Sequence, residues 1–120
     1  MMILSYDIGT TGVKTCLFRM GGEGPDVASI VMEDASSESY SLSVLPNGGV
    51  EQNPHEWWEA MCETTRRLVS RNPVAYSQIA GISFCAQAQS VVLLDESARA
   101  LRPSMSYMDQ RSGGVRRAHA

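Results

Sequence analysis

Residue types that build metal centres and nucleophilic triads are scarce in this 120-residue chain. The three cysteines, Cys16, Cys62 and Cys85, share no CxxC or other metal-ligand spacing, and only two histidines, His55 and His119, are present. These counts argue against a zinc site and against a Ser-His-Asp triad. Each cysteine falls in a segment patterned as a strand or helix, so we expect buried free thiols and a reducing, cytoplasmic compartment.

Long hydrophobic runs and a charge imbalance are missing too. No apolar segment approaches the roughly 20 residues that span a membrane, and the first carboxylate, Asp7, comes too early for a signal peptide. A net charge of −3 gives no reason to expect nucleic acid or an anionic membrane as a partner. An apolar content of 43% is that of an ordinary globular chain, and the length is that of one domain.

What the chain does have is a polar run between two apolar ones, which predicts a β-hairpin. Glycines at its turn let successive backbone N–H groups point at one anion, and hydroxyls can add donors. The residues suited to a nucleotide's phosphates are Asp7, Gly9, Thr10, Thr11 and Lys14, with Asp7 as the candidate Mg²⁺ ligand. The alternative is an ordinary turn built for geometry alone, because neither GxxxxGK[ST] nor GxGxxG occurs.

The remaining sequence is patterned as an α/β protein. We expect strands at residues 1–7, 13–18, 27–32, 79–85, 91–94 and 104–107, the first three in an antiparallel meander. Glycines and a proline predict a turn at 21–26. Residues 33–50 are rich in serine and are expected to form a loop, within which 40–45 could add a short strand.

A long helix is predicted between Asn53 and Asn72. Asn53 can cap it, Pro54 suits the first helical position, and Glu56 stands three residues after the cap. The residues expected on the packed face or beside it, both tryptophans included, are Trp57, Trp58, Met61, Cys62, Thr65, Leu68 and Val69.

Four parts of the chain resemble, in the same order, the FGGY carbohydrate kinases, and xylulokinases in particular. The hairpin run is similar to the first phosphate motif of the actin, hexokinase and Hsp70 superfamily, to which those kinases belong. The matching segments are Asp7–Lys14, Glu51–Pro54 with Trp57–Trp58, Ile79–Gln87 with Val92–Asp95, and Leu101–Pro103 with Tyr107–Arg111.

The resemblance implies a fold. It is α/β, an incomplete ribonuclease-H-like N-terminal domain over residues 1–111, with a mixed sheet that begins as an antiparallel meander. Residues 112–120 are set apart as a tail whose structure is left open, because the resemblance implies a helix here whereas paired glycines are poor helix formers. An incomplete domain exposes a sheet edge, so self-association is expected, and the resemblance implies a homodimer for the full-length protein.

The resemblance also implies ATP and Mg²⁺ as cofactors. Asp7 would lie near the magnesium ion, Thr10 and Thr11 would contact the terminal phosphates, and Lys14 would balance their charge. A sugar or polyol would be the second substrate.

For that substrate, the implied contacts are Gln87, Ala88, Gln89 and Asp109. Xylulokinases have a Gln-Met-His-Gly-like segment where this chain has Gln87-Ala88-Gln89-Ser90. Ala88 leaves more room than methionine, whereas Gln89 keeps both a donor and an acceptor. An ordinary polar turn at 87–90 is the alternative, and Asp109 could instead form a structural ion pair with Arg111.

The implied function is the N-terminal part of an ATP-dependent sugar kinase that transfers the γ-phosphate to a hydroxyl of a ketose such as xylulose. The family's catalytic aspartate and its adenosine-binding segments lie downstream, so the isolated chain is expected to be inactive. Gluconate, glycerol or ribulose are alternative substrates. A non-catalytic actin-like or sugar-sensing module, or a degenerate product without activity, are the alternative functions.

Overall fold

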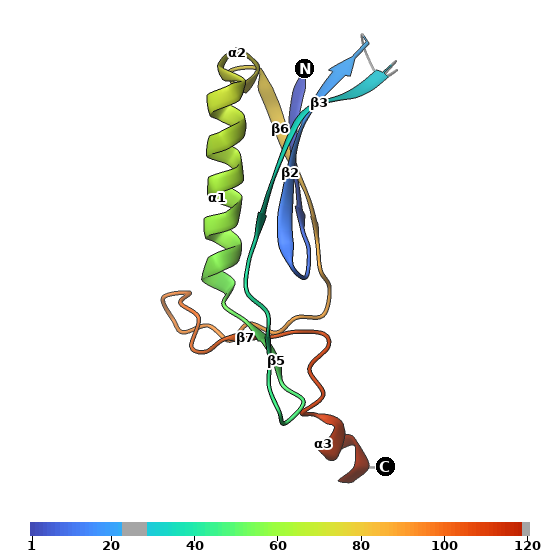
Figure 1. The fold of residues 1–120 in the computed structure, drawn as a ribbon, viewed down its shortest axis with the longest axis vertical. Helices are drawn as coiled ribbons and strands as arrows, with labels where there is room; N and C mark the ends of the chain where they lie inside the picture. Colours follow the sequence, from blue (N-terminus) through green and yellow to red (C-terminus); the bar gives the residue numbers. More distant parts are fainter. Residues whose placement is uncertain (23–28, 119–120) are drawn as a thin grey trace. The chain divides into compact units, whose positions relative to one another are not determined.

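The computed structural model describes residues 1–22 and 29–118, which form two compact units. The first unit comprises residues 1–40 and 57–86, and the second comprises residues 41–56 and 87–120. The elements of the first unit are β1 (Met2–Ile8), β2 (Gly12–Gly21), β3 (Ser29–Ser39), α1 (Pro54–Arg71, which begins in the second unit), α2 (Pro73–Tyr76) and β6 (Ile79–Ala86) (Figure 1).

A four-stranded mixed sheet with the order β3-β2-β1-β6 forms the first unit. The pairs β1–β2 and β2–β3 are antiparallel, whereas β6 runs parallel to β1. This arrangement confirms the predicted mixed sheet and its opening meander. The predicted turn at 21–26 and the start of the strand expected at Val27 lie mostly outside the described residues.

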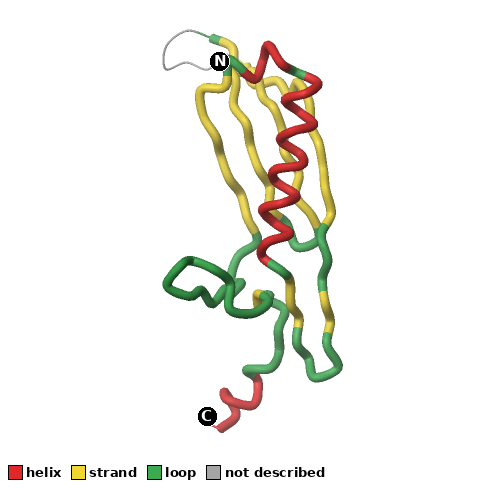
Figure 2. Tube along the Cα trace, turned by 90° about the vertical axis from the view of Figure 1, so that its left-hand side faces the viewer, coloured by secondary structure: helices red, strands yellow, loops and turns green. Residues whose placement is uncertain are grey.

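Helix α1 lies along one face of this sheet (Figure 2). Its buried residues are Ala60, Thr64 and Leu68, which follow one another at i+4 spacing. They pack onto a sheet core of Met2, Leu4, Tyr6, Val13 and Leu17. The first unit therefore has a single apolar layer between one helix and one sheet face.

The expectation that both tryptophans pack in the core is wrong for Trp58, whose exposed fraction is 62%. Trp58 stands two positions before Ala60, about 200° around the helix from the buried stripe. Trp57 is half-buried, and its indole N–H is enclosed without a hydrogen-bond partner among the described residues. The buried stripe is thus displaced by about one residue from the predicted face.

Hydroxyl pairs link α1 to the sheet. Thr15 and Thr64 are both fully buried, and their hydroxyl oxygens are 2.7 Å apart. The Thr64 hydroxyl also donates to the Ala60 carbonyl at 2.9 Å, so Thr15 is the donor toward Thr64. The Tyr6 hydroxyl lies 2.6 Å from that of Thr65. Because these groups satisfy one another, polar side chains are accommodated between the layers.

The two ends of α1 are fixed by side chains. The Asn53 carboxamide oxygen accepts the His55 backbone N–H at 3.0 Å, which confirms the predicted cap. At the other end, Arg71 donates two hydrogen bonds to Asp34 on β3, and Asn72 donates a third. The Arg71 hydrogen bonds, and then that of Asn72, lower the pKa of Asp34 to about 2. The carboxylate is therefore ionised at neutral pH.

The serine-rich segment after Met32 differs from its prediction. Strand β3 continues to Ser39, so the loop expected from residue 33 begins only after the strand. Pairing with β2 along its whole length, and ion pairs from Arg67 to Glu38 and from Arg71 to Asp34, hold this segment extended. The serine content predicted a loop, but pairing with β2 stabilises a strand here.

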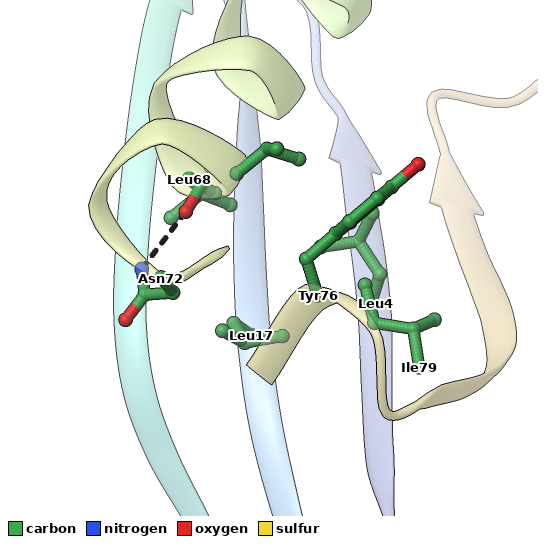
Figure 3. Close-up of a pocket in the computed structure, with 7 residues that line it drawn as sticks. Leu4, Leu17, Leu68, Asn72, Tyr76 and Ile79 are labelled. Carbon is green, nitrogen blue, oxygen red and sulfur yellow. Dashed lines mark hydrogen bonds between the residues drawn. The ribbon is translucent and has the colours of Figure 1, made fainter. Parts of the chain in front are cut away.

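A cavity near the C-terminal end of α1 is too small for a ligand. It encloses about 10 Å³ among apolar side chains that include Leu4, Leu17 and Leu68, with the Asn72 amide donating to the Leu68 carbonyl at its rim (Figure 3). That volume is about one water molecule's space. It is a packing gap.

Strand β6 is one edge of the sheet. Ile82 and Phe84 on this strand have exposed fractions of 58% and 61%, and the Phe84 ring stacks on Tyr6 with 5.5 Å between centroids. An exposed apolar edge strand is a site for strand pairing with another chain. The expected self-association stays a prediction.

The second unit contains a small sheet with the order β4-β5-β7, made of β4 (Ser43–Val44), β5 (Val50–Gln52) and β7 (Ser104–Met105), followed by α3 (Gly113–Ala118). The strand expected at 91–94 is wrong: only isolated bridges form, from Val91 to Met105 and from Leu94 to Ala100. The helix α3 forms despite its two glycines, where the resemblance implied one.

All three cysteines are free, as predicted, but Cys85 on the edge strand is exposed, so the expectation of burial is wrong there. Cys16 and Cys62 are half-buried. None of the helices in the described ranges is both long enough and apolar enough to cross a membrane.

Candidate functional site

The turn between β1 and β2 places four of the predicted phosphate-binding residues around one depression. Asp7 and Lys14 are direct partners in the hairpin register, and the turn closes with the Gly9 N–H donating to the Gly12 carbonyl at 2.9 Å. The depression measures about 300 Å³ and is open to solvent. Its lining residues are Asp7, Gly9, Thr11, Gly12, Val13, Lys14, Ser37, Glu38 and Ser39.

Gly12 is required by a close approach of two strands. A Cβ atom at this position would lie 2.6 Å from the carbonyl oxygen of Glu38 and 3.1 Å from Cα of Ser39. Both are backbone atoms of β3, so a side chain here would have to move a strand. The second glycine of the run therefore lets β3 reach the turn.

Tyr40 holds the turn from a position 28 residues further along the chain. Its hydroxyl donates to the carbonyls of Gly9 and Gly12, the latter at 3.0 Å, and its backbone N–H donates to the Thr11 carbonyl at 3.2 Å. Burial, together with the negative charge of Asp7, raises the pKa of Tyr40, so the phenol stays protonated and can donate. The sequence offered no signal for this contact, because it depends on β3 extending to Ser39.

The donor set at the turn fits a magnesium–phosphate group. Asp7 is exposed beside the depression, whereas Glu38, the other carboxylate there, is paired with Arg67. Nowhere in residues 1–22 and 29–118 do three His, Cys, Asp or Glu side chains gather into a metal site. A single carboxylate suits Mg²⁺, which usually keeps several waters and takes its other ligands from substrate phosphates.

In the second unit, Asp109 is held within an ion-pair cluster. It accepts the Val50 N–H at 2.9 Å, the Arg111 N–H at 3.0 Å and the Arg111 guanidinium, which also donates to Glu51 at 2.9 Å. The side chain of Asp109 is only 9% exposed. The Arg111 hydrogen bonds hold the pKa of Asp109 well below its usual range and lower that of Glu51, while the pKa of Arg111 is raised.

These contacts show what Asp109 does within the unit. Its carboxylate accepts the Val50 N–H and so fixes the backbone at the start of β5. Its ion pair with Arg111 is the structural role that was considered as the alternative. A direct contact with a sugar stays a prediction.

Polar atoms without partners mark the region of Gln87. The Gln87 amide nitrogen donates to the Gln52 side chain at 3.0 Å, but its oxygen is buried without a partner in the described part of the chain. The hydroxyls of Ser90 and Ser104 are also buried and unpaired there. Gln52 and Ser104 are neighbours across β5 and β7, and Val91, next to Ser90, bridges to Met105, next to Ser104. These groups therefore belong to one region of the unit. Unmet hydrogen-bonding capacity of this kind calls for a ligand or water.

Gln89 has strained backbone geometry. Its φ angle is +63°, in the left-handed region that residues other than glycine rarely adopt. Ala88 and Gln89 are both exposed. Sequence reasoning singled out Gln87, Ala88 and Gln89 by resemblance. It did not assign a site role to Gln52, which accepts a hydrogen bond from Gln87, or to Ser104, which pairs with Gln52 in the strand register.

Comparison with known proteins identifies the relatives of this chain. The family model described as the N-terminal domain of the FGGY family of carbohydrate kinases matches residues 2–118. A gluconokinase from Bacillus subtilis is 34% identical over 93% of this chain and 20% of its own length, and a xylulose kinase from the same organism is 33% identical over 92% and 20%. The crystal structure of a xylulose kinase from Rhodospirillum rubrum superposes with a TM-score of 0.83 at 28% identity, over 100% of this chain and 24% of that one.

The chain thus spans about a fifth of the length of the curated relatives it matches. The family match also includes most of the 112–120 segment that the sequence left as a separate tail.

Proposed function

The chain belongs to the FGGY family of carbohydrate kinases, and from this premise we propose that it supplies the phosphate-binding turn and part of the acceptor site of an ATP-dependent sugar or polyol kinase. The observation that carries the proposal is the Gly9–Gly12 turn, with the Asp7 carboxylate, the Thr11 hydroxyl and the Lys14 ammonium around one open depression. The unpaired thiols fit a cytoplasmic location.

The residues of the turn would bind and orient the phosphates. Phosphoryl transfer depends mainly on positioning the phosphates and neutralising their charge. Lys14 provides a cation, Thr10 and Thr11 provide hydroxyl donors, and Asp7 provides one carboxylate for a hydrated Mg²⁺. The magnesium ion, when bound with ATP, would neutralise charge on the phosphate oxygens.

Gln87, Ala88 and Gln89 would contact the acceptor, with Asp109 keeping β5 in place nearby. The buried, unpaired Gln87 oxygen and the strained Gln89 support this assignment, because buried polar atoms without partners and left-handed backbone often mark ligand sites. A ketose such as xylulose is the acceptor we propose first, and gluconate, glycerol and ribulose are the alternatives. The general base and the adenosine-binding residues would come from outside these 120 residues.

A chimeric kinase tests the proposal. The 120 residues would replace the matching N-terminal segment of the Bacillus subtilis xylulose kinase, and ADP release would be measured with Mg-ATP and xylulose, ribulose, gluconate or glycerol. We expect sugar-dependent ADP release from the chimera and none from the 120 residues alone. A folded chimera that is inactive with every acceptor would contradict the proposed function.

Gln89→Gly separates an acceptor contact from a structural role. Glycine adopts the left-handed backbone without strain, so the substitution should leave the stability unchanged or raise it by up to about 1 kcal/mol. The same substitution removes the side chain that would bind the acceptor, so KM for the acceptor should rise at least about tenfold. The chimera's KM and the midpoint of its thermal unfolding are the measurements.

Ala98→Gly is the matched control, because Ala98 has the same left-handed geometry, with φ of +60°, in the exposed turn after Asp95. Ala98→Gly should relieve as much backbone strain as Gln89→Gly does, and the KM for the acceptor should not change. An unchanged KM in Gln89→Gly would remove Gln89 from the acceptor site.

A further inference from the structure

Three carbonyl groups of the phosphate-binding turn accept hydrogen bonds from one residue that the family resemblance did not single out. Tyr40 contacts the carbonyls of Gly9, Thr11 and Gly12, using its hydroxyl for two of them and its backbone N–H for the third. These three contacts cover almost the whole turn between β1 and β2. Tyr40 is not among the residues that line the depression.

The contacts of the carbonyl groups also determine where the neighbouring N–H groups point, because peptide groups are planar and trans. In a trans peptide the C=O and the following N–H point in opposite directions. Because the Gly9 and Thr11 carbonyls point at Tyr40, the N–H groups of Thr10 and Gly12 point away from it. An anion bound to this turn needs N–H groups that converge on it, with the carbonyl oxygens directed elsewhere.

We propose that Tyr40 is a positioning residue, whose hydroxyl and backbone N–H fix the turn so that the Thr10 and Gly12 N–H groups face a bound phosphate chain. The inference rests on the proposed function and adds to it. Without these contacts, the glycine-containing turn could rotate its peptides, and binding would have to restore their orientation. Tyr40 itself would touch no phosphate.

The site around Tyr40 makes this role specific. Its ring packs against the apolar core of the first unit, which fixes where the hydroxyl lies. Removing only the hydroxyl, in Tyr40→Phe, keeps that packing and deletes two of the three contacts with the turn.

Tyr6→Phe is the matched control. The Tyr6 hydroxyl is also partly buried and bonded within the first unit, but its partner is Thr65 on α1 and not the turn. Both variants lose one phenolic hydroxyl, so both should lose a similar amount of stability. Only Tyr40→Phe should change phosphate binding.

The test is a titration of the ¹⁵N-labelled 120-residue chain with inorganic tripolyphosphate and Mg²⁺, followed by amide NMR. In the wild type, the Thr10 and Gly12 N–H signals should move furthest. Tyr40→Phe should bind about tenfold more weakly, as expected for a lost hydrogen bond network, while Tyr6→Phe should bind within about twofold of the wild type, since its hydroxyl is bonded elsewhere.

The outcomes separate this inference from the function on which it rests. If the wild type binds tripolyphosphate but the Thr10 and Gly12 amide signals do not move, the proposed role of Tyr40 is wrong. It is also wrong if Tyr40→Phe binds tripolyphosphate with the affinity of the wild type. Equal weakening in both variants would mean a general loss of order and would also overturn it. No binding by the wild type would overturn the proposed phosphate site itself.

Discussion

Asp7→Asn should reduce sugar-dependent ADP release by the chimeric kinase by a factor of about 100 or more, as expected for a lost metal ligand in phosphoryl transfer. Asparagine keeps the size of the side chain and one oxygen, but it lacks the charge that holds a hydrated Mg²⁺ beside the phosphates. Asp7 is exposed at the end of β1 and has no described ion pair, so the fold should not depend on its charge. The measurements are kcat at saturating Mg-ATP and the unfolding midpoint.

Glu33→Gln is the control for this substitution. Glu33 is a carboxylate on the same sheet, paired with Arg19 on the surface and remote from the turn in the β2–β3 register. The control should keep its turnover, because exposed ion pairs contribute little to stability. Wild-type turnover in Asp7→Asn would remove Asp7 from the magnesium site, and a loss that excess Mg²⁺ restores would point to weakened metal binding.

Local signals made the first half of the fold predictable. The hairpin depends on two apolar runs around a polar turn with glycines, all within 18 positions, and the helix depends on Asn53 and Pro54 at its start. Both are properties of neighbouring residues. The strand extension to Ser39 was missed because serine runs have low strand propensity, and the pairing with β2 overrides it.

The buried stripe of α1 was misplaced by about one residue for a related reason. Met61 and Leu68 do pack against the core as predicted, but hydrophobicity alone gave no place to Thr64, whose hydroxyl meets that of Thr15 on the sheet. Threonines on the helix meet hydroxyls of the sheet, so the polar residues are buried and Trp58 turns outward. No apolar pattern could have shown a helix that pairs polar groups.

The part of the site that lies in one continuous segment was predictable from the sequence. The turn residues come from a continuous run, and the structure places four of the five around the depression. The contacts of Tyr40, Gln52 and Ser104 join segments 28 or more residues apart. Local pattern therefore did not reveal Tyr40 or Ser104, and the family-like segment that contains Gln52 did not show which residue Gln52 contacts. Asp109 was found by resemblance, with the ion pair to Arg111 as the alternative; the structure shows that pair and adds the Val50 N–H, which no sequence pattern indicated.

Gly12→Ala should destabilise the 120-residue chain by about 3 kcal/mol, at the upper end of the usual cost of overpacking. The new Cβ would lie 2.6 Å from the Glu38 carbonyl oxygen, and the atoms it meets belong to the backbone of β3, which cannot rotate away. Relief requires β3 to separate from the turn, which would also displace Tyr40 from the Gly9 and Gly12 carbonyls. Urea unfolding and the tripolyphosphate titration should therefore both be affected.

Gly81→Ala isolates this clash from the general effect of replacing a strand glycine. A Cβ at Gly81 on β6 would meet only the Cδ1 atom of Ile3, at 3.4 Å, and neither glycine has a left-handed backbone. Alanine there should be neutral or stabilise the chain by up to about 1 kcal/mol, because it restricts the unfolded state. Suppose that Gly12→Ala has the same free energy of unfolding as Gly81→Ala and binds tripolyphosphate as tightly as the wild type. Then β3 can move away from the turn without loss of stability or of phosphate binding. The second glycine of the run would then serve neither the close approach of β3 nor the phosphate site.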